Sequence, residues 1–229
     1  MIYGRFTNRS DAGRRLAAKL MHLTEQDPVV LALPRGGVAV GFEVARALKA
    51  PLDLVLVRKI GAPFQPELAI GALANGGHVE TVLNRGLAEL VSDEWLREAK
   101  EQQLGEMERR RVVYLKGRPR APIAGRTAIL VDDGIATGAT MRAALRSVRR
   151  AFPRRLVLAV PVAPPAAVSD LTAEVDEVVC LHTPSSFGAI GNFYEDFRQL
   201  DDADVIRLLD AAERDFAPHR RGSYQKSAQ

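Results

Sequence analysis

Residues 127–141 read Thr-Ala-Ile-Leu-Val-Asp-Asp-Gly-Ile-Ala-Thr-Gly-Ala-Thr-Met. Ala128–Val131 is a short, continuous apolar run, which predicts a strand covered on both faces of a sheet. Asp132 and Asp133 follow at its carboxyl end, where open α/β sheets bind their ligands. From Met141 onward apolar residues recur at helical spacing, so we expect a helix after a tight loop of small residues.

The loop 134–140 has the composition of a phosphate-binding site. Orphan backbone N–H groups at a helix N-terminus favour an anion, and Thr137 and Thr140 can add hydroxyl donors. The carboxylates of Asp132 and Asp133 would repel a phosphate unless they face another group, and the vicinal hydroxyls of a sugar are suitable donors to them. The stretch therefore indicates a sugar 5-phosphate site, and a plain strand–turn–helix is the alternative.

In these residues the chain resembles the type I phosphoribosyltransferases, whose signature is a hydrophobic strand, two acids and a Thr/Gly loop that binds phosphoribosyl pyrophosphate. The segment 129–140 carries the resemblance, and it fits neither a P-loop nor the dinucleotide fingerprint. The resemblance implies an α/β fold with an open, mostly parallel twisted sheet flanked by helices. It also implies a small C-terminal hood and a long charged helix insertion.

The 229 residues are expected to form a single domain, 1–229, with a helical insertion at about 84–118, a hood at 182–200 and a loose tail at 217–229. Hydrophobic content of 47% is ordinary for a globular protein. No apolar run approaches the ~20 residues of a membrane helix, and no signal-peptide core is expected at Met1–Ser10. Cys180 is the single cysteine, so no internal disulfide is possible, and we expect a core cysteine and a cytoplasmic protein.

The net charge of +4 suits an anionic ligand and also nucleic acid. Much of the excess is arginine in separate clusters without interleaved aromatic residues, which is typical of solvated faces, so nucleic acid is disfavoured as a partner. The clusters are Arg14-Arg15, Arg109-Arg110-Arg111, Arg149-Arg150 with Arg154-Arg155, and Arg220-Arg221.

Periodicity predicts the remaining elements. Strands are expected at Val29–Leu33, Leu52–Val57, Leu156–Val160 and Glu177–Leu181, with a hairpin of Ala69–Ala74 and Val79–Leu83 across Asn75-Gly76-Gly77. Helices are expected after Ser10 or Asp11, from Val38, from Ser92 to about Tyr114, over Pro165–Leu171 and over Asp201–Phe216. The helix after Ser92 is highly charged, with a thin inner stripe of Leu96, Ala99, Leu104 and Met107.

Pro34-Arg35-Gly36-Gly37 comes directly after the predicted strand Val29–Leu33. It therefore occupies the same position in its β-α unit as the loop 132–140 does after the strand Ala128–Val131. Arg35 offers a permanent cation, and the two glycines allow a second anion to approach the backbone, although a tight turn with a surface arginine is the bland alternative. In the resembled family a loop in this place binds pyrophosphate, often with a cis peptide before its basic residue. Here that bond would be Pro34–Arg35.

Two further segments take their roles from the resemblance. Arg58-Lys59 resembles the basic pair at a strand end that precedes a mobile loop, here expected from about Gly61 into Asn75-Gly76-Gly77. For Lys59 a solvated surface lysine is the alternative. In 182–200, Phe187 would stack on a nucleobase, with Tyr194 and Asp196 as hydrogen-bond partners, whereas aromatic packing is the alternative.

The resemblance implies transfer of a 5-phosphoribosyl group from phosphoribosyl pyrophosphate to a nitrogenous base, with release of pyrophosphate. Arg35, Lys59, Asp132 and Asp133 are the expected catalytic residues. The expected substrate-binding residues are Gly36, Gly37, Arg58, Gly134, Ile135, Ala136, Thr137, Gly138, Ala139, Thr140, Phe187 and Tyr194. Mg²⁺ is the expected cofactor, held mainly by the substrate with Asp132 and Asp133 as weak ligands. The resemblance also leaves room for a homodimer.

One position departs from the resembled family. Purine-salvage members commonly carry an acid at the position of Ala136, and alanine cannot transfer a proton, so the acceptor is not assigned. The chain is most similar to bacterial phosphoribosyltransferases of unassigned substrate. Two alternatives stay open: a regulatory module that binds phosphoribosyl pyrophosphate or a nucleotide, with RNA or DNA, and a sugar-phosphate hydrolase with Asp132 as base.

Overall fold

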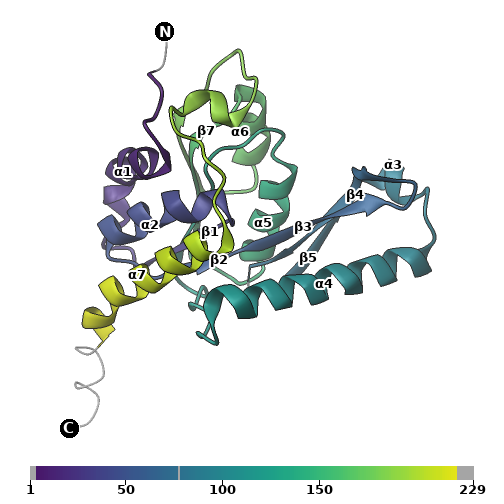
Figure 1. Ribbon diagram of the computed structural model, residues 1–229, viewed down its shortest axis with the longest axis horizontal. Coiled ribbons are helices and arrows are strands. Elements are labelled where there is room, and N and C mark those ends of the chain that lie inside the picture. The colour runs from purple at the N-terminus through teal and green to yellow at the C-terminus, as the bar shows by residue number, and fades with distance from the viewer. Residues whose placement is uncertain (1–3, 77, 221–229) are drawn as a thin grey trace.

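A parallel five-stranded sheet forms the centre of the protein (Figure 1). The computed structural model describes residues 4–76 and 78–220. The strands are β1 (Pro28–Ala32), β2 (Leu52–Leu54), β6 (Thr127–Val131), β7 (Arg155–Val162) and β8 (Glu177–His182), in the order β2-β1-β6-β7-β8. Every neighbouring pair in this sheet is parallel, which confirms the predicted fold class.

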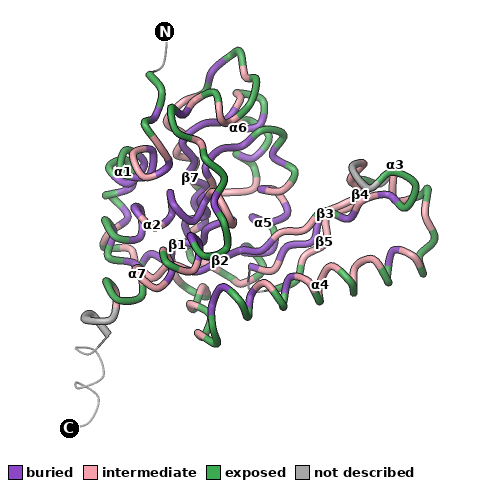
Figure 2. Tube along the Cα trace, in the orientation of Figure 1, coloured by how far each residue is buried: buried purple, intermediate pink, exposed green. Residues whose placement is uncertain are grey.

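Helices cover both faces of this sheet. On one face α1 (Arg9–Leu20) and α2 (Gly36–Leu48) pack against a buried cluster that includes Ile129 and Val131. On the other face α5 (Ala139–Arg149) and α6 (Pro165–Thr172) pack against Leu130 and its neighbours. The alternate residues of β6 thus face different helical layers, and the buried trace in Figure 2 follows these strands.

A second, antiparallel sheet extends away from the first (Figure 1). It consists of β3 (Leu56–Ala62), β4 (Gln65–Asn75) and β5 (Val79–Leu83), followed by α3 (Arg85–Ala88) and α4 (Asp93–Leu115). The long helix α4 lies along this sheet and buries Leu96 and Met107 against it, so the predicted inner stripe is confirmed. The final helix is α7 (Asp202–Arg220), which contacts α2 and α4.

The predicted strand Leu52–Val57 is wrong in one respect, because the chain leaves the parallel sheet after Leu54. The register of β2 with β1 ends at the pair Leu54 and Ala32, and β3 then pairs with β4. The segment from Gly61, expected as a loop, accordingly forms the end of β3, a turn at 63–64 and β4. The apolar run gives no sign of the break, because apolar residues continue through it. In β3, Leu56 packs on the α4 side and Val57 packs toward α5.

The hairpin predicted for 69–74 and 79–83 is confirmed, since Gly71 pairs with Leu83 and Asn75 with Val79. Gly77, in its turn, lies outside the described residues. The predicted tail began too early, because the backbone of 217–220 continues α7. The rest of the predicted tail, 221–229, lies outside the described residues.

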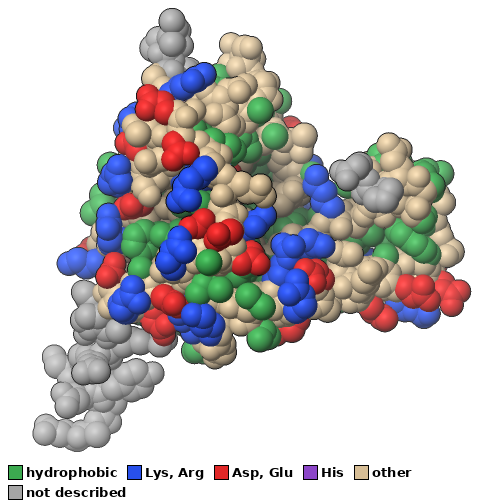
Figure 3. Space-filling model, viewed as in Figure 1, with side chains coloured by type: hydrophobic (Ala, Val, Ile, Leu, Met, Phe, Trp, Pro, Cys, Tyr) green, Lys and Arg blue, Asp and Glu red, His purple; other side chains and the backbone are tan. Residues whose placement is uncertain are grey.

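The arginine clusters are paired with acids rather than gathered into one patch. Arg110 lies 2.9 Å from Glu106, Arg149 lies 3.0 Å from Asp176, and Arg15 lies 2.8 Å from Asp11. Basic and acidic side chains are accordingly intermixed on the face shown in Figure 3. Arg221 of the last cluster is outside the described residues. Within the described ranges, none of the helices has the length and apolar character needed to cross a bilayer.

Candidate active site

The candidate site lies where β1 and β6 end side by side. Ala32 is paired with Val131, and the Leu33 amide donates to the Val131 carbonyl at 3.0 Å. From these ends the chain continues into α2 on one face of the sheet and α5 on the other. Two loops that diverge to opposite faces at adjacent carboxyl ends mark a topological switch point, which is where α/β sheets bind ligands.

The two loops touch at the glycines of 34–37. A Cβ on Gly36 would overlap the Asp133 carboxylate, and one on Gly37 would lie 2.8 Å from the Val131 carbonyl oxygen. These glycines therefore let the loop after β1 pack directly on the acidic pair. From the sequence we predicted only that these glycines let an anion approach the backbone. We did not predict this contact between the two loops.

The loop after β1 has the backbone form that the resemblance implied. The Pro34–Arg35 peptide is cis, which confirms that expectation. Arg35 is partly exposed, and its Nη1 lies 3.8 Å from Oδ1 of Asp202 at the start of α7. The same oxygen accepts a hydrogen bond from the buried Tyr114 hydroxyl at 2.7 Å. The Arg35 guanidinium is thus directed toward Asp202, with part of its surface in solvent.

The second half of the loop 134–140 is more exposed than the first half, although Gly138 is buried. The side chains of Ala136, Thr137 and Ala139 are exposed, and Gly138 begins α5 with a φ of 78°, a left-handed conformation that favours glycine. Among the described residues, no protein acceptor takes a hydrogen bond from the backbone N–H groups of 136–141. These donors suit an anion at the N-terminus of α5.

Ile135 and Gly134 have structural roles instead, and this corrects the expectation for Ile135. The Ile135 amide donates to the Val162 carbonyl at 2.9 Å, and the Ile135 side chain is buried in the core. Neither the amide nor the side chain is therefore available to a ligand. Gly134 packs against the hood, since a Cβ there would lie 2.7 Å from the Ile190 side chain. The part of the loop whose backbone donors are available to a ligand is therefore 136–140.

In each of the two carboxylates, one oxygen accepts a hydrogen bond from the protein. Asp132 Oδ1 accepts the Asp133 amide at 2.8 Å, and Asp133 Oδ2 accepts from Arg9 Nε at 2.7 Å. Asp132 Oδ2 and Asp133 Oδ1 have no such partner, and neither is among the fully buried, unpaired polar atoms of the described residues. Asp132 is partly exposed and Asp133 is 8% exposed, so these two oxygens are candidate acceptors for two hydroxyl groups.

Burial shapes the charge of this pair. Desolvation raises the pKa of Asp132, and the neighbouring Asp133 carboxylate raises it further. Desolvation also raises the pKa of Asp133, whereas the Arg9 guanidinium opposes that rise. Arg9 thus favours the ionised form of Asp133. We did not predict Arg9, although a cation in the first turn of a helix opposes the helix dipole and is a weak sign of another partner.

Tyr194 does not face a ligand, which corrects the prediction that it contacts the base. It is 3% exposed, and its hydroxyl donates to the Asp133 carbonyl at 2.6 Å. Burial raises its pKa, so this hydroxyl stays protonated. Phe187 is half-buried and stacks on Phe193 with ring centres 5.3 Å apart, whereas Asp196 accepts the Arg198 amide at 3.0 Å.

The basic pair in β3 is divided between the two faces of its sheet. Arg58 points to α4, where its Nε donates to Gln103 at 3.1 Å, so the structure favours α4 as its partner over the expected substrate. Lys59 is exposed and lies on the same face as Val57, which packs toward Ala143 of α5. Strand alternation therefore leaves Lys59 as the cation on the α5 side.

The described residues suit a Mg²⁺ ion that is held mainly by a phosphorylated substrate. They contain no cluster of three or more His, Cys, Asp or Glu side chains that could hold a metal. The free oxygens of Asp132 and Asp133 supply one or two carboxylate contacts. Mg²⁺ commonly keeps several waters and binds through one or two carboxylates plus substrate phosphates, so this donor set fits such a use.

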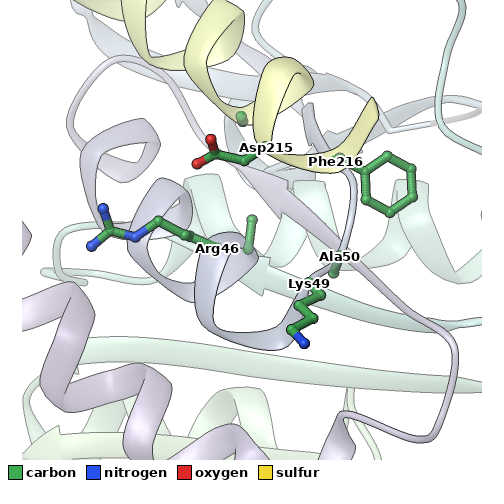
Figure 4. Close-up of a pocket in the computed structure, with 7 residues that line it drawn as sticks. Arg46, Lys49, Ala50, Asp215 and Phe216 are labelled. Carbon is green, nitrogen blue, oxygen red and sulfur yellow. The ribbon is translucent and has the colours of Figure 1, made fainter. Parts of the chain in front are cut away.

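A small cavity of about 40 Å³ lies elsewhere, between α2 and α7 (Figure 4). Arg46, Lys49 and Ala50 line it from the C-terminal end of α2, and Asp215 and Phe216 line it from α7. Gly36, which packs on the acidic pair, is at the opposite end of α2. This cavity is therefore separate from the candidate site at the carboxyl ends of β1 and β6.

Comparisons with known proteins point to one family. Residues 3–198 match the family model described as a phosphoribosyl transferase domain. The chain is 49% identical over 214 residues to a curated Mycobacterium tuberculosis protein whose name gives it, provisionally, as a phosphoribosyl transferase, and the match covers 93% of this chain and 48% of that protein. The chain thus spans about half the length of the curated relatives it matches. It is also 46% identical to the crystal structure of TT1426 from Thermus thermophilus, with a TM-score of 0.77 over 90% of this chain and 97% of that one.

Proposed function

The chain belongs to the phosphoribosyl transferase family, and from that premise we propose that it transfers a 5-phosphoribosyl group from phosphoribosyl pyrophosphate to a nitrogenous acceptor, with release of pyrophosphate. One observation carries the proposal. Two free carboxylate oxygens, on Asp132 and Asp133, lie directly before a loop whose N–H groups at 136–141 have no protein acceptor among the described residues. The carboxylate oxygens can accept from the two hydroxyls of a diol, and the N–H groups beside them can donate to a phosphate. A ribose 5-phosphate carries both of these groups.

The proposed ligand position follows from these groups. The 5-phosphate binds the backbone N–H groups of 136–140, with the Thr137 and Thr140 hydroxyls as further donors. The ribose hydroxyls donate to Asp132 and Asp133. The pyrophosphate group then lies toward the loop 34–37, where Arg35 and, from the α5 side of β3, Lys59 supply positive charge.

The proposed reaction requires little covalent chemistry from the protein's side chains. A nitrogen lone pair forms a bond to C1 of the ribose while the bond from C1 to the pyrophosphate oxygen breaks, through a transition state with oxocarbenium character. Positioning of the ribose and neutralisation of the leaving group by Arg35 and Lys59 lower the barrier. Mg²⁺, when bound with the substrate, adds charge neutralisation at the pyrophosphate oxygens.

The acceptor side of the site lacks a proton-transfer group in its nearest segments. Loop 134–140 contains no titratable side chain, and neither does the hood segment 183–193. Ala136 is exposed there, so a base above it meets a methyl group. We therefore favour an acceptor whose reacting nitrogen already carries an available lone pair.

The direct test is an assay of pyrophosphate release with phosphoribosyl pyrophosphate, Mg²⁺ and a panel of bases that includes purines, pyrimidines and pyridine carboxylates. We expect release that depends on one acceptor. Release without any acceptor would instead indicate hydrolysis with Asp132 as base.

A ligand-binding module without turnover is the second candidate, and the exposed Ala136 is the observation that favours it. It predicts binding of phosphoribosyl pyrophosphate in calorimetry with no release for any acceptor. Binding without release would therefore replace the first proposal, and absence of both would contradict the two together.

A further inference from the structure

Arg9 is a buried cation with three partners from distant parts of the chain. It is 9% exposed, and its Nε donates to Asp133 at 2.7 Å. Its Nη1 donates to the Arg198 carbonyl at 2.8 Å, and its guanidinium carbon lies 3.8 Å from the centre of the Phe197 ring. A buried charge is costly unless it is paired and hydrogen-bonded, so these contacts fix the guanidinium in place.

Asp133 is also held from its other sides. The Tyr194 hydroxyl donates to its main-chain carbonyl at 2.6 Å, and Gly36 leaves no room behind its carboxylate. With Oδ2 bound to Arg9, only Oδ1 is open to a ligand. The direction of that oxygen therefore depends on Arg9.

The segment that carries Phe197 and Arg198 is attached to the residues just before Arg9. The Phe6 amide donates to the Phe193 carbonyl at 2.8 Å, and the Glu195 amide donates to the Phe6 carbonyl at 2.8 Å. The Asp196 amide donates to the Thr7 carbonyl at 2.9 Å. Arg9 thus joins the N-terminal residues, the segment 193–198 and the acidic pair in one contact network.

We propose that Arg9 is a positioning residue that aims the Asp133 carboxylate at the ribose hydroxyls and couples this aim to the docking of segment 193–198. This inference rests on the proposed function, because it assigns Arg9 to the same site. The Arg9 guanidinium does not contact the substrate. It acts through Asp133, so its removal should affect recognition of the diol and leave recognition of the phosphate in place.

The test compares ribose 5-phosphate with 2-deoxyribose 5-phosphate, which share the phosphate and differ by one hydroxyl. Dissociation constants are measured by calorimetry for the wild-type protein, Arg9→Met, Arg9→Lys and the control Arg14→Met. Arg14 is on the same helix, its side chain is 56% exposed, and its ion pairs with Asp11 and Glu43 are long, at 4.0 and 3.7 Å.

We expect the wild-type protein and Arg14→Met to bind ribose 5-phosphate about tenfold more tightly than the deoxy sugar, which corresponds to about 1.4 kcal/mol. Arg9→Met should lose this preference while its affinity for the deoxy sugar stays within about twofold of wild type. Arg9→Lys keeps the charge but not the planar fork, so it should retain about a threefold preference. Hydrogen exchange at 193–198 should be faster in Arg9→Met than in Arg14→Met.

A tenfold preference retained in Arg9→Met, or in a folded Arg9→Lys if the methionine variant unfolds, would overturn the inference. Equal binding of the two sugars by the wild-type protein would also overturn it, while leaving a phosphate site intact. Failure of the wild-type protein to bind either sugar would instead contradict the proposed function itself.

Discussion

At the scale of the residue, the candidate site depends on a glycine that leaves space for an acid. Gly36→Ala would place a methyl group on the Asp133 carboxylate, so we expect loss of about 1–3 kcal/mol of folding free energy in denaturant unfolding. Gly105→Ala in α4 is the matched control, because a Cβ there meets nothing within 4 Å. It should stabilise the protein by about 0.5–1 kcal/mol. Equal effects of the two changes would show that Gly36 is not a contact point.

Cys180 supplies a second prediction at this scale. Burial raises the pKa of its thiol to about 11 from an ordinary value of 9.0, because it disfavours the thiolate. The thiolate is the reactive form, so alkylation of the native protein at pH 8 should be about a hundredfold slower than in the unfolded chain. The native rate should then rise with pH until about pH 11. Mass spectrometry of this single cysteine measures both, and equal rates in the two states would contradict a buried thiol.

At the scale of the element, β3 turns two adjacent cations in opposite directions. Lys59→Ala should weaken pyrophosphate binding by about tenfold, a loss of about 1.4 kcal/mol, because Lys59 lies on the α5 side of the strand. Arg58→Ala should change it by less than about twofold, because Arg58 bonds to Gln103 of α4. Calorimetry with pyrophosphate separates the two, and the reverse order would contradict the register of β3.

The long helix α4 is held by a narrow buried stripe. Met107 is fully buried against the antiparallel sheet, so Met107→Ala should cost about 2–5 kcal/mol of folding free energy. Val112 on the same helix is 60% exposed, and Val112→Ala should change stability by no more than about 0.5 kcal/mol. Denaturant unfolding of both variants checks this. Similar costs would mean that α4 does not dock through the predicted stripe.

At the scale of the whole molecule, local patterns predicted the elements that are organised locally. The apolar run of β6 and the hairpin around Asn75 are short-range features, and both were confirmed. The break between β2 and β3 was not predicted, because Leu54 and Leu56 lie in one buried cluster on either side of it, so the run of apolar residues gives no sign of the change.

The contacts that complete the site could not be predicted from local sequence patterns, because they join residues far apart in the chain. Arg9 and Asp133 are 124 positions apart, and Tyr194 and Asp133 are 61 apart. A hydrogen bond between such residues leaves no periodicity in the sequence. For the same reason Tyr194 was expected in the ligand site, whereas its hydroxyl bonds the main chain of the acidic loop.

The most direct measurement of the central claim is a crystal structure of the protein soaked with ribose 5-phosphate. The account predicts phosphate oxygens within hydrogen-bond distance of the N–H groups of 136–140, and sugar hydroxyls on Asp132 Oδ2 and Asp133 Oδ1. A sugar phosphate bound anywhere else, with those two oxygens and the loop untouched, would contradict it.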